Sequence, residues 1–149
     1  MSNHRVRILV INGPNLNLLG ARQPEVYGLE TLADLERRLR ERAEALGCDV
    51  ELRQSNLEGE IVSWLHESCG AFDAVVMNPG AYAHYSYAIR DAITSARVRL
   101  FEVHISNVYA REEFRHRSVI APVAAGIVVG MGTMGYELAL EAAVRTARG

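Results

Sequence analysis

The sequence predicts an α/β fold in which helices cover both faces of a parallel sheet. Segments with the apolar pattern of buried strands alternate along the chain with amphipathic helical segments. The first strand segment, residues 6–11 (VRILVI), is a largely apolar run, which is typical of a strand buried on both faces of a parallel sheet. An apolar content of 49% over 149 residues is enough for one core, so we expect a single domain spanning 1–149.

The first predicted helix, residues 32–46, has clear signals at both ends. Thr31 is its expected N-cap, with Asp34 three residues later as in a capping box, and Gly47 ends it. Its apolar stripe consists of Leu32, Leu35, Leu39, Ala43 and Leu46.

The remaining elements continue the alternation of strands and helices. The predicted later strands are 49–53, 73–77, 98–104 and 126–129, and the later helices are 57–68, 86–96 and about 133–147. In the second helix Ile61, Trp64 and Leu65 share one face. Five such units favour a flavodoxin-like five-stranded sheet of order 2-1-3-4-5, an order taken by analogy. A site is then expected beyond the carboxyl ends of strands one and three.

Composition and charge exclude several classes of function. The net charge is −2, with 16 basic and 18 acidic residues, so we expect no nucleic-acid partner and no anionic membrane surface. Two cysteines, Cys48 and Cys69, suggest no disulfide framework and favour the reducing cytoplasm. The apolar run within the first eleven residues is too short for a secretory signal, and no later apolar run is long enough to span a bilayer.

The chain contains no lysine, so every basic residue is an arginine. A lysine Schiff base with a substrate carbonyl, a pyridoxal phosphate anchor and a phosphate-loop lysine are therefore excluded.

Polar residues gather where the predicted strands one, three and four end. These clusters are 12–22, 78–86 and 102–106, and they are expected to face one crevice. Glu102 and His104 stand two residues apart on a strand, so their side chains share a face. A carboxylate beside an imidazole supports the protonated form and suits a general acid. A buried ion pair that braces the strand end would give the same pattern.

Two further patterns are weaker. Residues 130–135 match G-x-G-x-x-G, but only 14 residues follow, and a dinucleotide site needs an acidic residue about 20 positions on. Close strand–helix packing explains these glycines better. The five histidines show no paired ligand spacing, so no metal is expected.

Residues 12–28 form a long loop with glycines and prolines, the profile of a lid. This loop carries Arg22 and Tyr27 close together. A phenol with an ordinary pKa of about 10 is a poor base at neutral pH unless positive charge stabilises its anion. Arg22 could supply that charge, although an ordinary surface tyrosine fits the same sequence.

Three blocks resemble the type II 3-dehydroquinate dehydratase family, in order and over most of the chain. They are N-G-P-N-L-N-L-L-G-x-R-x-P-x-x-Y-G at 12–28, N-P-G-A-Y-A-H at 78–84 and E-V-H-I-S-N-V-Y-A-R-E-E-F-R at 102–115. The resemblance implies a cofactor-free lyase of the shikimate pathway, which leads to chorismate and aromatic amino acids. The sequence leaves open whether the reaction serves this biosynthesis or the breakdown of quinate. Its substrate would be 3-dehydroquinate, which loses water through an enolate to give 3-dehydroshikimate.

The resemblance also implies a role for each matching residue. Tyr27 would be the base, Arg22 the group that stabilises the tyrosinate, and Asn15 the residue that holds a water against the enolate oxygen. His104 would be the general acid, oriented by Glu102. The implied substrate contacts are Asn78, His84 and Arg115 to the ring hydroxyls, and Ile105 and Ser106 to the carboxylate.

The resemblance also implies one residue with a role in closure of the lid and one with a role in assembly of the oligomer. Arg111 would close beside the tyrosine, and Asp91 would reach a neighbouring subunit's site in a dodecamer built of trimers. One departure from the family's pattern is Gln23, where the lid more often has a glutamate; its effect on the closed lid is left open.

Two alternatives belong to other classes. A flavodoxin-like module could bind a flavin or nucleotide without catalysis, but Pro14 lacks an N–H and makes the loop after strand one a poor phosphate cradle. A catalytically dead oligomeric scaffold would not need Tyr27, Arg22 and His104 together.

Overall fold

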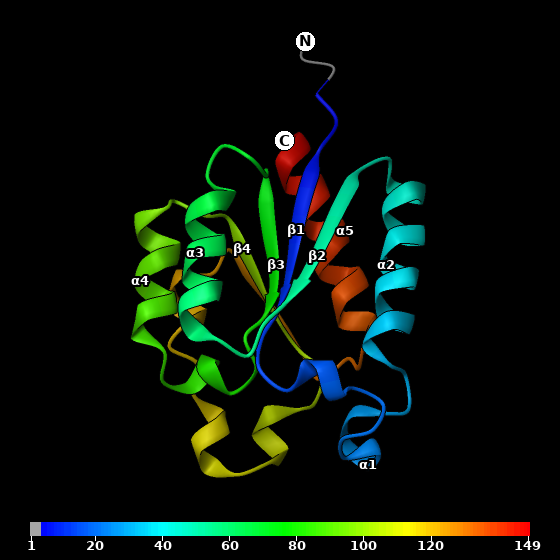
Figure 1. Ribbon diagram of the computed structural model, residues 1–149, viewed down its shortest axis with the longest axis vertical. Helices are drawn as coiled ribbons and strands as arrows, with labels where there is room; N and C mark the ends of the chain where they lie inside the picture. The colour runs from blue at the N-terminus through cyan, green and yellow to red at the C-terminus, as the bar shows by residue number, and fades with distance from the viewer. Residues whose placement is uncertain (1–3) are drawn as a thin grey trace.

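The computed structural model describes residues 4–149 and is built on a five-stranded parallel sheet of order β2-β1-β3-β4-β5 (Figure 1). The strands are β1 (Arg7–Asn12), β2 (Asp49–Gln54), β3 (Ala74–Asn78), β4 (Leu100–His104) and β5 (Gly126–Val129). The predicted fold class and strand order are confirmed.

Helices cover both faces of this sheet. In Figure 1, α2 (Leu32–Leu46) and α5 (Met134–Arg148) lie on one face, and α3 (Glu58–Ser68) and α4 (Tyr87–Ser95) lie on the other. Strand β1 shows why both faces need cover, because its side chains alternate between two apolar clusters. Ile8 and Val10 pack with α2 and α5, whereas Leu9 and Ile11 pack with α3 and α4, and all four are fully buried.

The predicted signals of the first long helix are confirmed. The Thr31 hydroxyl accepts from the Asp34 N–H and the Asp34 carboxylate accepts from the Thr31 N–H, both at 3.1 Å. Gly47 follows α2 with a left-handed φ of 69°, a conformation that favours glycine.

The expected start of the fourth strand at residue 98 is wrong, because β4 begins at Leu100. Residues 96–98 close the end of α4 instead. Arg97 has a left-handed φ of 53°, and the Val98 N–H donates to the Ile93 carbonyl at 3.0 Å. This hydrogen bond and the left-handed Arg97 keep residues 96–98 in a turn, so the strand begins only at Leu100.

Short helical turns occupy three stretches for which the sequence predicted no elements. The loop after β1 contains η1 (Leu16–Leu18) and a four-residue helix, α1 (Pro24–Tyr27), and the loop after β3 contains η2 (Gly80–His84). The stretch after β4 contains η3 (Val108–Ala110), η4 (Glu113–His116) and η5 (Ala121–Val123). Such turns are too short to leave a periodic apolar stripe in the sequence.

The close strand–helix packing expected of the glycine-rich segment 130–135 is confirmed at Gly135. A Cβ atom there would lie 3.3 Å from a methyl group of Val128 and 3.4 Å from one of Val103. Among residues 4–149, no helix combines the length and the apolar character needed to cross a membrane.

The backbone of the first loop lies against the loop after β3, and this contact depends on Gly13. Its N–H donates to the Asn78 carbonyl at 2.8 Å, and a Cβ atom on Gly13 would lie 2.6 Å from the Pro79 carbonyl oxygen. We expect Gly13→Ala to lower the free energy of unfolding by about 1–3 kcal/mol, because two backbone segments must move apart.

Urea unfolding followed by circular dichroism would measure this loss. Gly59→Ala in α3 is the matched control, since nothing lies within 4 Å of the added methyl group. That change should leave stability unchanged or raise it by roughly 0.5–1 kcal/mol. Equal midpoints for the two variants would contradict the packing described for Gly13.

Candidate active site

One pocket lies beyond the carboxyl ends of β1, β3 and β4, near the end of the molecule that carries α1 in Figure 1. Most of its walls come from the three predicted polar clusters, and the lining residues outside their bounds are Tyr27, Val108, Arg111 and Arg115. Ten of the twelve predicted site residues line it: Asn15, Arg22, Tyr27, Asn78, His84, His104, Ile105, Ser106, Arg111 and Arg115. The predicted convergence of three strand ends on one crevice is therefore confirmed.

Two guanidinium groups lie next to Tyr27. Arg111 Nη1 donates to the Tyr27 hydroxyl at 2.8 Å, while the Arg22 guanidinium carbon lies 5.1 Å from the centre of the Tyr27 ring. The arginine at the hydroxyl is thus Arg111, and Arg22 lies over the ring.

Glu102 lies beneath His104 and does not line the pocket. Glu102 Oε2 and His104 Nε2 are 2.5 Å apart, and the exposed fractions of the two residues are 0% and 8%. Since Nε2 is bound to the carboxylate, Nδ1 is the ring nitrogen that remains for a ligand.

The tautomer of His84 follows from its partner. His84 Nδ1 lies 2.8 Å from the Arg117 carbonyl oxygen, which can only accept, so Nδ1 carries the hydrogen. Burial lowers the pKa of His84, and the positive charges of His104 and Arg115 act in the same direction. His84 is therefore neutral at neutral pH, with Nε2 as a hydrogen-bond acceptor.

A buried network that the sequence analysis missed holds Asn78 in place. Asn12 on β1 and Asn78 on β3 are register partners, and the Tyr136 hydroxyl bridges them. This hydroxyl donates to Asn12 Oδ1 at 2.6 Å and accepts from Asn78 Nδ2 at 2.9 Å. Burial raises the pKa of Tyr136, so the phenol keeps its proton. The one signal in the sequence was a polar residue, Asn12, directly after an apolar strand.

The glycine-rich turn after β5 supports the end of β4. The Gly130 N–H donates to the His104 carbonyl and the Gly132 N–H to the Ile105 carbonyl, both at 3.0 Å. These N–H groups are not available to cradle a phosphate, which argues against a dinucleotide site here. Within residues 4–149, no cluster of three or more His, Cys, Asp or Glu side chains could hold a metal ion.

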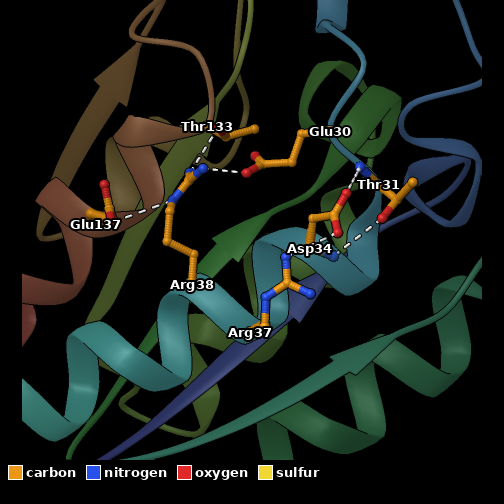
Figure 2. A network of polar contacts seen from close by, with 7 residues as sticks. All are labelled: Glu30, Thr31, Asp34, Arg37, Arg38, Thr133 and Glu137. Atoms are coloured by element: carbon orange, nitrogen blue, oxygen red, sulfur yellow. Dashed lines mark hydrogen bonds and ion pairs between the residues drawn. The ribbon is translucent and has the colours of Figure 1, made fainter.

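An ion-pair network fixes the end of the loop that carries Arg22 and Tyr27 (Figure 2). Arg38 on α2 pairs with Glu30, donates to the Thr133 hydroxyl at 2.8 Å, and lies 3.4 Å from the Glu137 carboxylate. The loop is thus anchored to α5 where it meets α2. Gln23 is exposed at the start of α1, where its side chain makes no capping hydrogen bond.

Asp91, like Glu102, is a predicted site residue that does not line the pocket. It is exposed on α4 and lines no part of the pocket of its own chain.

Comparisons with known proteins agree on one family. A family model described as "Dehydroquinase class II" matches residues 6–144. A 3-dehydroquinate dehydratase of Halalkalibacterium halodurans is 60% identical over 135 residues, which cover 91% of this chain and 93% of that protein. One from Variovorax paradoxus is 57% identical over 143 residues, covering 93% and 98%. The crystal structure of a type II dehydroquinase from Butyrivibrio crossotus has a TM-score of 0.92 at 48% identity, covering 93% of this chain and 97% of that one.

The bridge between Asn12 and Asn78 yields a prediction. Tyr136→Phe removes a hydroxyl that serves both amides, and buried groups that lose a partner cost about 1–3 kcal/mol. We expect this loss in the free energy of unfolding, measured by urea titration. Tyr87→Phe, on a residue that is 61% exposed, is the control and should change stability by less than about 0.5 kcal/mol. A Tyr136→Phe protein as stable as this control would contradict the bridging role.

Proposed function

Because the chain belongs to the class II dehydroquinase family, we propose that it is a lyase that dehydrates 3-dehydroquinate to 3-dehydroshikimate in the shikimate pathway. The observation that carries this proposal is the pairing of two titratable groups in one pocket. A tyrosine hydroxyl held by Arg111 and an imidazole held by Glu102 both border it. Such a pair suits a reaction that takes one proton from carbon and gives one to a leaving hydroxyl.

In the proposed first step, Tyr27 acts as the base. Its tyrosinate takes a proton from the carbon next to the substrate ketone, and the electron pair moves onto the ketone oxygen to form an enolate. Arg111 at the hydroxyl and Arg22 over the ring stabilise the tyrosinate before this transfer. An enolate formed beside a ketone needs no cofactor if its oxygen is stabilised in place.

Asn15 is proposed to supply that stabilisation by holding a water against the enolate oxygen. Its backbone is well placed for a fixed role, because Asn15 has a left-handed φ of 69° and its N–H donates to Asn56 Oδ1 at 3.0 Å. The side chain makes no capping hydrogen bond to η1, which leaves its amide for a ligand.

In the proposed second step, His104 acts as the acid. Its imidazolium gives a proton to the departing hydroxyl as the enolate collapses, so water leaves and the carbon–carbon double bond forms. Glu102, buried beneath the ring, favours the charged imidazole and fixes its orientation. Tyr27 then holds one proton and His104 lacks one, and exchange with solvent restores both.

The remaining lining residues are proposed to bind the substrate. Nε2 of His84 would accept from a ring hydroxyl, while Asn78 and Arg115 would contact the other hydroxyls. The substrate carboxylate would lie at Ile105 and Ser106, bound by backbone N–H groups and the serine hydroxyl. The segment 20–28 would act as a lid that excludes water once the substrate is bound.

Assembly and location complete the proposal. We propose a dodecamer built of trimers, located in the cytoplasm, in which Asp91 reaches the pocket of a neighbouring subunit. The exposure of Asp91 on α4, away from its own pocket, supports this shared site.

The proposed reaction predicts that 3-dehydroquinate added to the purified protein produces the ultraviolet absorbance of a conjugated enone. Tyr27→Phe should lower kcat by roughly 10²-fold or more, because a positioned base contributes about that much. His104→Ala should be comparably damaging through the loss of the acid.

Tyr87→Phe is the control for these kinetics and should retain wild-type turnover. Activity that disappears with a chelator, or that borohydride destroys only in the presence of substrate, would contradict a cofactor-free reaction. Retention of more than about a tenth of wild-type kcat by Tyr27→Phe would rule out Tyr27 as the base.

The shared site predicts complementation between two defective chains. Tyr27→Phe lacks the base in its own pocket, and Asp91→Ala lacks the carboxylate that a neighbour needs. In co-expressed mixed oligomers some pockets combine an intact Tyr27 with an intact donated Asp91, so activity should exceed the sum of the separate proteins. Mixed oligomers without this gain, or a fully active Asp91→Ala protein, would rule out the shared site.

A further inference from the structure

The buried carboxylate of Glu102 has a second hydrogen-bond partner besides His104. Ser118 Oγ donates to Glu102 Oε2 at 2.8 Å, the same oxygen that lies 2.5 Å from His104 Nε2. The other oxygen, Oε1, is buried and has no hydrogen-bond partner in the part of the chain that the structure describes. The position of the carboxylate therefore depends on these two contacts.

The direction of the Ser118 hydrogen bond is fixed by the backbone. Ser118 Oγ also accepts from the N–H groups of Ile120 at 3.1 Å and Ala121 at 3.0 Å. A hydroxyl has one proton and two lone pairs, and both lone pairs are thus occupied. The proton of Ser118 is left for Glu102, and the hydroxyl acts only as a donor to the carboxylate.

The segment that carries Ser118 is itself held firmly. The Val119 N–H donates to the Ala83 carbonyl at 2.7 Å, and the side chains of Val119 and Ile120 are buried in the cluster beneath α3 and α4. The preceding carbonyl, that of Arg117, accepts from His84. Residues 117–119 thus form one backing segment that contacts both histidine assemblies of the pocket.

A hydrogen bond to a charged oxygen is about twice as strong as one between neutral groups. Ser118 consequently stabilises the ionised carboxylate more than it stabilises a protonated Glu102. From these contacts, and on the basis of the dehydration proposed above, we propose that Ser118 is a positioning residue that acts through Glu102 to keep the proton on His104.

The charges around His104 explain why this support matters. His84 from η2 is stacked on His104, with ring centres 6.4 Å apart, and Arg115 from η4 borders the same pocket. Arg22, Tyr27 and Arg111 face the pocket from the other segments, and none of the described residues that line it is an Asp or Glu. Glu112 pairs with Arg115 at 3.1 Å and lies 3.9 Å from Arg111, whereas Glu102 is the carboxylate that contacts the His104 ring directly.

The test is the pH dependence of dehydration by Ser118→Ala. A hydrogen bond to a charged group contributes about 1.5–3 kcal/mol, which corresponds to roughly a 10- to 100-fold fall in kcat. KM should change little, because Ser118 does not line the pocket. A general acid must be protonated to act, so turnover falls as pH rises through its titration. Without Ser118 the ionised form of Glu102 is less stable and supports the proton on His104 less well, so this fall should occur at lower pH.

Two matched variants separate positioning from folding. Ser118→Thr keeps the donor and should restore the wild-type pH profile. Ser68→Ala removes a buried hydroxyl of α3 that donates to the Leu65 carbonyl at 2.7 Å, far from the pocket, and should not move the profile. If Ser118→Ala does not fold, Ser118→Cys keeps the shape with a weak donor and should move the profile in the same direction.

A second readout keeps this proposal distinct from the proposed function. Nuclear magnetic resonance of the His104 ring nitrogens, in the protein without substrate, follows its titration whether or not 3-dehydroquinate is turned over. We expect His104 to lose its proton at lower pH in Ser118→Ala than in wild type. An unchanged titration, or an unchanged profile in an active enzyme, would overturn the role of Ser118. An unmoved absorbance with wild-type protein would instead overturn the proposed function.

Discussion

The parallel pairing of β1, β3 and β4 is the constraint on which the rest of the site depends. Because the three strands are neighbours and run in the same direction, their carboxyl ends meet at one edge of the sheet. The register sets the next level of detail: Asn12 lies beside Asn78 on the face covered by α5, where Tyr136 can bridge them. Glu102 lies beside Met77, whose side chain packs in the cluster beneath α3 and α4, on the other face of the sheet. On that face Ser118 donates to the Glu102 carboxylate. A one-residue slip would exchange these faces and separate every group from its partner.

Within that frame, the two groups proposed as base and acid have different neighbours. Tyr27, the proposed base, has the Arg111 guanidinium at its hydroxyl and the Arg22 guanidinium near its ring. His104, the proposed acid, has the carboxylate of Glu102 beneath it. Acid and base assignments of this kind arise from surroundings rather than from residue type alone. These different surroundings are the basis for the acid and base roles proposed above.

Much of this could be predicted from the sequence, for identifiable reasons. Strand runs such as residues 6–11 are apolar because both faces are buried, and the polar residues that follow them mark the strand ends. The fold and the position of the crevice could therefore be predicted. Contacts between segments that are distant in the sequence could not be predicted. Ser118 lies in a stretch of short 3-10 turns without periodicity, and Tyr136 looks in the sequence like any apolar residue of α5. The sequence also could not tell which arginine meets the Tyr27 hydroxyl, because that depends on how two loops pack together.

In the proposed mechanism, a tyrosinate at position 27 removes the proton from carbon. The most direct measurement replaces Tyr27 alone with a fluorinated tyrosine, whose phenol is more acidic and differs little in size, and records the pH profile of kcat/KM. We expect the acidic limb of the profile, where the base becomes protonated, to move to lower pH as fluorine atoms are added, while the alkaline limb stays in place. An acidic limb that does not move would contradict the assignment and require another base.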